Sequence, residues 1–442
     1  MMIYHIYPLG MCGAPHKSEG QPMNMRLEQI QEFKQYLIDM GITAVYYGPV
    51  FQSESHGYDT IDYYNIDRRL GNNETFAVIS KSFEASGIRT IVDGVFNHVS
   101  REFFAFQNVL KNGASSEYSS WFYLDFNKRS PKGDPFSYEC WEGHFNLVKL
   151  NLKNMNVREH LFGAVRQWIM DYNIAGIRLD VAYALDKEFM KDLRKVCKDI
   201  RPDFWLMGEV IHGDYRQLLG GEMLDSVTNY ESYKGLFSSH NDKNYFEIAY
   251  SLNRQFSKYG LYRNFLLYNF VDNHDVSRAA SILKDKTHLY PLYVLLMTIP
   301  GIPSIYYGSE LGIEGDKKNG DQALRQALQY STVKKLAEKN ELLNHIKKLS
   351  KIRRDSNALC FGEYEQIYVN NEQFVFARKM DDEYILVMVN QSNAAIDVKL
   401  PNLYQHGCYE DVLNPGEQIE LNQRKNTVRL YPNWGRILRR KI

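Results

Sequence analysis

Gly176-Ile-Arg-Leu-Asp180 is the stretch that decides how the rest of the chain is interpreted. It is a short apolar run in which Arg178 and Asp180 stand two positions apart. Residues two apart in a β-strand point to the same face, so both side chains would project from the C-terminal end of one strand. An arginine beside a carboxylate lowers the pKa of that carboxylate and keeps it ionised. We therefore expect Asp180 to be an anion that can act as a nucleophile.

Three other stretches also end an apolar, strand-like run in acidic or histidine residues. They are Asp93-Gly-Val-Phe-Asn-His98, Gly208-Glu209 and Phe270-Val-Asp-Asn-His-Asp275. Any one of them alone could be a polar residue that caps a strand. Four such stretches along one chain, each after a β-rich run, instead indicate a shared site.

The segments between these motifs alternate between strand-like and helical patterns, and this alternation predicts a parallel β/α architecture. The predicted strands are Ile3–Tyr7, Thr43–Tyr47, Arg89–Asp93, Gly176–Leu179, Trp205–Met207, Leu224–Thr228, Asn264–Val271 and Ser304–Tyr307. The predicted helices are Arg26–Met40, Thr75–Ser86, Val157–Tyr172, Lys187–Asp199, Tyr245–Tyr259, Pro291–Thr298 and Glu341–Arg353, the last capped by Asn340. Eight β/α units over roughly 350 residues predict an α/β fold of the (β/α)8 TIM barrel type.

Two segments depart from this alternation. Residues 99–149 are rich in Phe, Tyr, Trp, Gly, Ser and Asn with little periodicity, and so long an irregular insertion is usually functional. From about Cys360, short β-type runs are separated by Asn, Asp and Gly turns. We expect a barrel over 1–98 and 150–355, an inserted domain B after strand three over 99–149, and a C-terminal antiparallel β-sandwich domain over 356–442.

Composition excludes several classes of partner. The 53 basic and 53 acidic residues give zero formal net charge, which argues against nucleic acid. No run of 18 apolar residues and no secretory leader are present, so no membrane partner is expected. The five cysteines are scattered and odd in number, which predicts free thiols in the cytoplasm. An aromatic content of 14% is weak support for a sugar ligand.

The four motifs would meet at the mouth of the predicted barrel, because the C-terminal ends of barrel strands form the active site. Several carboxylates and two imidazoles would then converge. Paired carboxylates are the machinery of glycoside hydrolysis. A metal is the competing use of such a cluster, but Arg178 beside Asp180 disfavours a cation there.

These motifs resemble those of the α-amylase family of glycoside hydrolases (family thirteen), in the family's order and over essentially the whole chain. Leu147-Val-Lys-Leu-Asn151 and His56-Gly-Tyr-Asp59 resemble two further family motifs. The resemblance implies that Asp180 is the nucleophile, Glu209 the general acid and base, and Asp275 a stabiliser of the transition state.

The resemblance also implies a set of substrate-binding residues. Tyr58 would stack under the sugar at the cleaved bond, and His98, Arg178 and His274 would bind that sugar. Asp321 and Arg325 match a pair that contacts the next sugar, although residues four apart could equally form an ion pair on a helix surface.

Within the family, the chain resembles the neopullulanase, cyclomaltodextrinase and maltogenic amylase group at Asp180-Val-Ala, Gly208–His212 and Phe103–Gly113. It begins at its first predicted strand, so we expect the N-terminal domain that this group uses for dimerisation to be missing, and no oligomeric state is predicted. Ala184 stands where secreted α-amylases have a histidine of the structural calcium site, and Asn97 lacks that partner. We therefore predict neither calcium nor any other cofactor.

The expected function is retaining hydrolysis of α-1,4 bonds in malto-oligosaccharides, or in cyclodextrins or pullulan, with some transglycosylation. The carboxyl groups of Asp180 and Glu209 should then lie roughly 5–5.5 Å apart. One alternative is an α-1,6-acting oligosaccharide glucosidase or a glucan transferase of the same family. A more remote alternative is a non-catalytic sugar-binding barrel.

Overall fold

The computed structural model describes residues 1–401 and 405–441 of the 442-residue chain. Eight parallel strands form its central sheet in the order β13-β12-β11-β5-β2-β1-β15-β14. A parallel pairing of Thr228 with Tyr268 joins the two ends of this order, so the sheet closes on itself. The predicted TIM barrel is confirmed. The strands are β1 (Ile3–Ile6), β2 (Ala44–Tyr47), β5 (Arg89–Gly94), β11 (Gly176–Leu179), β12 (Trp205–Gly208), β13 (Ser226–Val227), β14 (Tyr268–Asn269) and β15 (Ile302–Tyr306).

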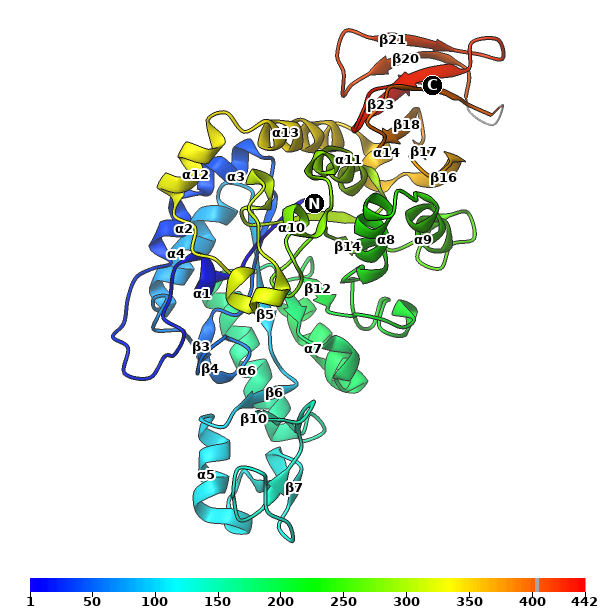
Figure 1. The fold of residues 1–442 in the computed structure, drawn as a ribbon. Coiled ribbons are helices and arrows are strands. Elements are labelled where there is room, and N and C mark those ends of the chain that lie inside the picture. The colour runs from blue at the N-terminus through cyan, green and yellow to red at the C-terminus, as the bar shows by residue number, and fades with distance from the viewer. Residues whose placement is uncertain (402–404, 442) are drawn as a thin grey trace.

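Helices follow most of these strands and cover the barrel (Figure 1). Side-chain caps fix where several of them start: Asn72 accepts from Thr75 N, Asp186 from Phe189 N, and Asn340 from Leu343 N as predicted. The helices are α1 (Pro8–Met11), α2 (Glu28–Glu32), α3 (Lys34–Asp39), α4 (Asn73–Glu84), α6 (Met155–Tyr172), α7 (Lys187–Ile200), α8 (Tyr230–Asn241), α9 (Phe246–Phe256), α10 (Ala279–Ile282), α11 (Leu289–Thr298), α12 (Tyr330–Ala337), α13 (Glu341–Arg354) and α14 (Asn357–Phe361).

Several details differ from the sequence prediction. The single helix expected over Arg26–Met40 is two short helices, α2 and α3, with Phe33 between them. Helix α8 was not predicted, because its buried face includes Ser232, Gly235 and Ser239 rather than a continuous apolar stripe. The strand expected over Asn264–Val271 is reduced to the two residues of β14.

Residues 98–149 project from the barrel after β5 and contain more regular structure than predicted. Helix α5 (Phe104–Asn112) buries Ala105, Phe106 and Val109, an apolar face that the polar residues around it obscured. Phe106 of this helix belongs to a buried aromatic cluster with Phe103, Trp121, Phe122 and Phe136. The strands here are β6 (His98–Ser100), β7 (Leu124–Asp125), β8 (Ser137–Tyr138), β9 (Cys140–Trp141) and β10 (His144–Lys149), and the loop after β2 adds β3 (Phe51–Ser53) and β4 (Thr60–Ile66).

The C-terminal part is an antiparallel β structure of two layers. Its larger sheet has the order β16-β17-β18-β23-β20-β21, and β19 pairs with β22. Val398 on β19 and Val428 on β22 share a core with Leu386 and Leu438 of the larger sheet. The strands are β16 (Glu363–Val369), β17 (Gln373–Met380), β18 (Glu383–Asn390), β19 (Ile396–Lys399), β20 (Gly407–Asp411), β21 (Gln418–Leu421), β22 (Thr427–Leu430) and β23 (Trp434–Lys441).

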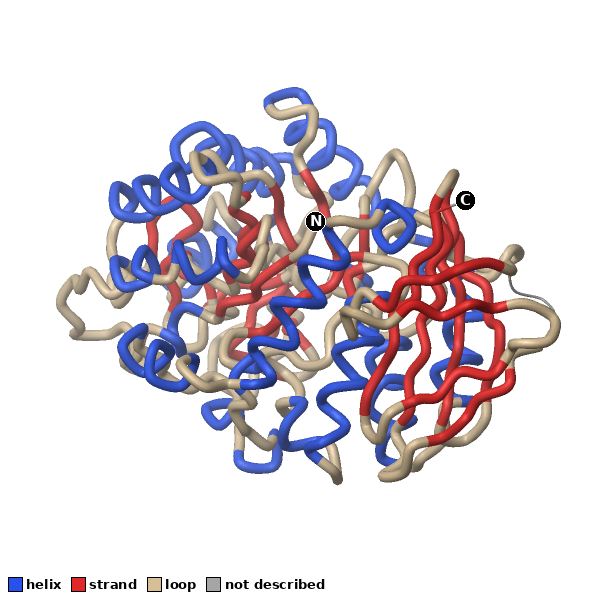
Figure 2. Tube along the Cα trace, turned by 90° about the horizontal axis from the view of Figure 1, so that it is seen from above, coloured by secondary structure: helices blue, strands red, loops and turns tan. Residues whose placement is uncertain are grey.

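The two additions lie at opposite ends of the molecule in Figure 1, with α5 and β7 at one end and β20 and β21 at the other. Figure 2 shows the C-terminal strands beside the helices of the barrel. Helix α11 lies at this junction, and all of its residues but Tyr290 are buried. No helix in the described ranges is both long and apolar enough to cross a membrane.

Candidate active site

Strand register brings the motif residues together at the C-terminal ends of β5, β11 and β12. Arg178 on β11 lies opposite Asp93 on β5, and Leu179 lies opposite Gly208 on β12. Asp180 and Glu209 follow directly after these paired positions. Asp93, Arg178, Asp180 and Glu209, which span more than a hundred positions of the sequence, therefore share one buried cluster.

The Arg178 guanidinium is the centre of this cluster. Its Nη1 lies 2.8 Å from both Asp93 Oδ1 and Asp180 Oδ1, and its Nη2 lies 2.9 Å from Glu209 Oε1. Burial alone would lower the pKa of Arg178, but Asp93 and Glu209 raise it well above its usual value. Arg178 is therefore a fixed cation that holds the predicted nucleophile and the predicted acid with adjacent nitrogens.

The expected lowering of the Asp180 pKa is wrong. Burial raises the pKa of Asp180 well above its usual value, and repulsion from Glu209 and Asp93 adds to the effect. The attraction of Arg178 does not outweigh them, because one guanidinium faces three carboxyl groups. Asp180 consequently holds its proton to a higher pH than an exposed carboxyl does, which sequence reasoning on Arg178 and Asp180 alone did not include.

Glu209 is held at both carboxyl oxygens. Its Oε2 accepts a hydrogen bond from Val181 N at 3.0 Å, while Oε1 faces Arg178. Val181 has φ 41° and ψ 47°, a left-handed conformation that a β-branched residue rarely adopts. This strained turn directly after Asp180 aims the Val181 amide at Glu209, and strain of this kind is typical of functional sites.

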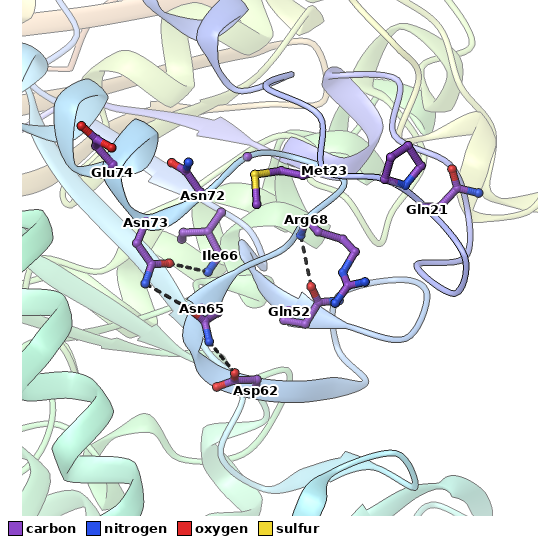
Figure 3. A pocket seen from close by; sticks show the side chains of 12 residues that line it. Gln21, Met23, Gln52, Asp62, Asn65, Ile66, Arg68, Asn72, Asn73 and Glu74 are labelled. Atoms are coloured by element: carbon purple, nitrogen blue, oxygen red, sulfur yellow. Dashed lines mark hydrogen bonds between the residues drawn. The ribbon is translucent and has the colours of Figure 1, made fainter.

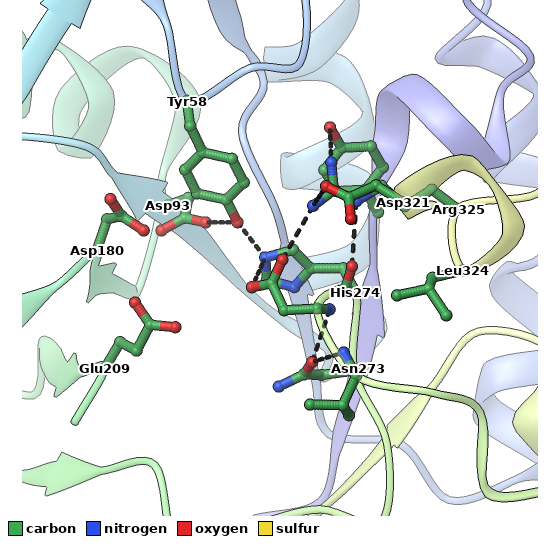
Figure 4. Close-up of polar contacts among 12 residues, drawn as sticks. Tyr58, Asp93, Asp180, Glu209, Asn273, His274, Asp321, Leu324 and Arg325 are labelled. Atoms are coloured by element: carbon green, nitrogen blue, oxygen red, sulfur yellow. Dashed lines mark hydrogen bonds and ion pairs between the residues drawn. The ribbon is translucent and has the colours of Figure 1, made fainter. Parts of the chain in front are cut away.

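Tyr58 and His274 lie across from Asp180 and Glu209 (Figure 4), and Asp275 contacts His274. The Tyr58 hydroxyl donates to Asp93 Oδ2 at 3.0 Å and also contacts His274 Nε2. His274 Nε2 lies 2.9 Å from Asp275 Oδ2. Burial alone would raise the pKa of Asp275, yet His274, Arg325 and Arg178 together lower it below its usual value. Asp275 is thus an anion at neutral pH.

Asp321 and Arg325 were expected either to contact a sugar or to pair with each other. Arg325 Nη2 lies 3.2 Å from Asp321 Oδ2 and 2.9 Å from Asp275 Oδ1, so the ion pair exists and reaches the carboxylate cluster. The guanidinium also stacks on the Tyr7 ring, 4.6 Å from its centre. Sugar contact by this pair stays a prediction.

His98 is buried with both ring nitrogens occupied. Its Nε2 donates to the Tyr58 carbonyl at 3.1 Å, and its Nδ1 accepts from Asn97 Nδ2 at 3.2 Å. Burial lowers the pKa of His98 to about 4, so the ring is neutral. His98 therefore supports the backbone of Tyr58 here, and its contact with a sugar stays a prediction.

Two contributors to the site had no role assigned from the sequence. Asp93, part of a predicted motif, lies near the end of β5 and accepts from Arg178, Tyr46 and Tyr58. Tyr7 follows β1 and contacts Arg325 and the His56 carbonyl. The sequence signal that could have identified their roles is their position at the ends of two predicted strands, the third and the first.

Ala184 offers no metal ligand, and the described ranges contain no group of three or more His, Cys, Asp or Glu side chains arranged to hold a metal. A cavity of about 730 Å³ contains none of the predicted site residues. It lies between the loop at Gln21–Met23 and the start of α4 (Figure 3). A cavity of about 460 Å³ instead includes Tyr7 and Arg325, beside the carboxylates.

Comparison with known proteins bears on this geometry. A sequence model of the alpha amylase catalytic domain matches residues 26–334. A cyclomaltodextrinase of Geobacillus thermopakistaniensis is 32% identical over 381 residues, which cover 85% of this chain and 63% of that protein. A cyclomaltodextrinase of Thermoanaerobacter pseudethanolicus is 33% identical over 411 residues, covering 91% of this chain and 69% of the relative. The chain thus spans about two thirds of the length of these relatives.

A solved structure of similar length also matches. It is the ligand-free form of a cyclic α-maltosyl-(1→6)-maltose hydrolase from Arthrobacter globiformis, 26% identical, with a TM-score of 0.82. The superposition covers 99% of this chain and 98% of the other.

Proposed function

Because the chain belongs to the α-amylase family, we propose that it is a retaining α-glucan hydrolase that cleaves α-1,4 bonds of malto-oligosaccharides. The observation that carries the proposal is the single guanidinium of Arg178, which holds Asp180 and Glu209 together. Retaining glycosidases need a nucleophile and an acid on close carboxyl groups. The two cyclomaltodextrinases named above support the substrate class.

The reaction assigns one role to each carboxyl group. The proton that the cluster retains is placed on Glu209 when substrate binds, and Glu209 gives it to the leaving oxygen. Asp180, left anionic beside Arg178, attacks the anomeric carbon and forms a glycosyl-enzyme. Glu209 then removes a proton from water, which releases the sugar from Asp180 with its configuration retained. A sugar hydroxyl in place of water gives transglycosylation.

Asp275 and Tyr58 act on the sugar ring rather than on the glycosidic bond that is cleaved. Positive charge develops on the ring in the oxocarbenium-like transition state. Asp275 is anionic because His274 and Arg325 lower its pKa, so it stabilises that charge. Tyr58 offers its partly exposed ring as a platform under the sugar.

One specific observation supports the α-1,6-acting alternative. The solved relative from Arthrobacter globiformis, whose name carries a (1→6) linkage, matches nearly the whole of both chains. Product analysis on maltotriose, panose and cyclodextrin separates the two activities. We also propose the cytoplasm as the location, since all five cysteines are unpaired.

The test is the kcat/KM of Asp180→Asn and Glu209→Gln on maltotriose. Each change removes a reacting group, so kcat/KM should fall at least about a thousandfold. Glu222→Gln, at a side chain that is 82% exposed, is the matched control and should keep full activity. A Glu209→Gln protein with near-normal turnover contradicts the proposal.

A further inference from the structure

The loop after β2 separates two cavities, one of which contains Arg325, the partner of Asp275. One, of about 510 Å³, lies between this loop and domain B and is lined by Lys132, His144 and Asn146. The other is the cavity of about 460 Å³ that contains Tyr7 and Arg325. Ser55 and His56 line both cavities, so this dipeptide is their common wall. Each volume lies within the range of small-molecule sites, about 300–1,000 Å³.

A buried arginine makes this wall rigid. Arg69 is fully buried, and its Nη1 donates to the carbonyls of Ser55 at 2.7 Å and His16 at 2.8 Å. Its Nη2 forms an ion pair with Asp67 Oδ2 at 2.6 Å. His56 is also fixed, because its Nδ1 accepts from Tyr58 N at 3.2 Å. The wall between the two cavities is therefore held in place by these hydrogen bonds.

Both cavities would lie on the side of the substrate that stays on the enzyme. Glu209, which follows β12, protonates the leaving oxygen, so the departing chain would lie on the Glu209 side. Figure 4 shows Asp180 and Glu209 on one side of Tyr58, with Asp321 and Arg325 on the other. The cavities are formed by the loops after β1, β2 and β15 together with domain B, and they would receive the glycone, the part that Asp180 holds.

The linings suit sugar hydroxyls. Among the described residues, the side chains of Lys132, His144 and Asn146 have no hydrogen-bond or ion-pair partner, and neither has that of Gln322 in the other cavity. These groups offer both donors and acceptors. They are free to bind a neutral, polyhydroxylated ligand in either direction from Tyr58.

From this arrangement we propose that the glycone cleft forks at Ser55–His56 and accepts a branched α-glucan. One chain, continuing through O4 or O6 of a glucose near the cleaved bond, runs to the Asp321 and Gln322 side. The second chain of the branch point occupies the cavity under domain B. The inference rests on the proposed function, because only a glycan cleaved at Asp180 would place its glycone here.

The experiment compares kcat/KM on two pentasaccharides of equal composition. One is linear maltopentaose, and the other carries one glucose as an α-1,6 branch on the glycone side. Asn146→Trp fills the cavity under domain B, so the branched-to-linear ratio should fall about tenfold, as a lost pocket contact does. Gln322→Trp fills the other cavity, so cleavage of both substrates should fall.

Controls separate this result from a general defect. Met23→Trp adds an indole to the wall of the cavity in Figure 3, which shares no lining residue with the other two, and should leave the ratio unchanged. Lys132→Trp fills the domain B cavity from another segment, so a failure of Asn146→Trp to fold does not end the test.

The fork is contradicted if Asn146→Trp and Lys132→Trp leave the branched-to-linear ratio of kcat/KM unchanged, whether or not both activities fall. A wild-type protein that cleaves the linear but not the branched substrate contradicts the fork alone. One that cleaves neither contradicts the proposed function as well.

Discussion

Burial of Asp180 makes the stability of the protein depend on pH in a defined direction. Its pKa is raised in the folded state, so the folded protein holds a proton that the unfolded chain loses above about pH 4. The contribution of Asp180 to stability therefore falls as pH rises above that value. Asp180→Asn removes this effect and keeps an oxygen for Arg178, so its melting temperature should exceed that of wild type by an amount that grows with pH.

Differential scanning calorimetry from pH 4 to pH 8 measures this difference. Asp171→Asn, at an exposed position on α6, is the control and should show no such trend. A difference in melting temperature that shrinks as pH rises would mean that the attraction of Arg178 outweighs burial and lowers the pKa of Asp180.

Arg325 keeps Asp275 anionic, so its removal should change the acid limb of the pH profile. After burial, which opposes ionisation, His274 and Arg325 are the groups that lower the pKa of Asp275. In Arg325→Met this pKa rises, and kcat/KM on maltotriose should decline at a higher pH than in wild type. Asp321→Asn is the control, because it leaves the pair of Arg325 with Asp275 in place.

An acid limb that moves equally in both variants would show that Asp275 ionisation does not set it. A raised KM in Asp321→Asn without any shift of the limb would support sugar binding by Asp321.

At the residue scale, the sequence predicts which side chains lie together better than it predicts their charge. The clustering of Asp180 and Glu209 could be predicted because each follows a strand of a recognisable pattern. The pKa of Asp180 could not, since it depends on the burial of Asp93 and Glu209 around it. The left-handed turn at Val181 also has no sequence signal, because valine normally avoids that conformation.

At the element scale, prediction succeeded where an apolar period was present. Strand β11 and helix α13 match their predicted ranges to within a residue. Helix α8 was missed because serine and glycine form much of its buried face, and α5 because aromatic composition suggested an irregular insertion. Whether such a segment becomes a helix depends on tertiary packing, which a local sequence pattern does not show.

Domain B should hold its shape without calcium. Its aromatic cluster is buried, and Arg101 pairs with both oxygens of Asp134 at 2.8 Å. A ligand stabilises a protein only if it binds the native state, so added calcium should barely shift the melting temperature. Activity on maltotriose should survive EDTA. Strong dependence of either quantity on calcium would reveal a site that this chain's residues do not indicate.

At the scale of the whole molecule, α11 explains how the C-terminal sheets attach to the barrel. The helix is apolar on nearly all sides because it packs against β18 and β23 as well as the barrel. Arg378 on β17 donates to the Thr298 carbonyl at its end, at 2.6 Å. The sequence predicted both the barrel and the β domain. It did not indicate what covers α11, because a helix without a polar face has no side marked as exposed.

The complete set of carboxyl groups argues against the non-catalytic alternative. A sugar-binding barrel has no need for Asp180, Glu209 and Asp275 in one site, and burying Asp180 and Glu209 is unfavourable unless function maintains them. The central claim is therefore chemical: Asp180 forms a covalent bond to the sugar.

Trapping that bond is the most direct test. Glu209→Gln is incubated with α-maltosyl fluoride, whose leaving group needs no acid, while the missing base slows release of the sugar. Mass spectrometry of the intact protein should show one added maltosyl group, and peptide mapping should place it on Asp180. An adduct on another residue, or a wild-type product with inverted configuration, would contradict the account.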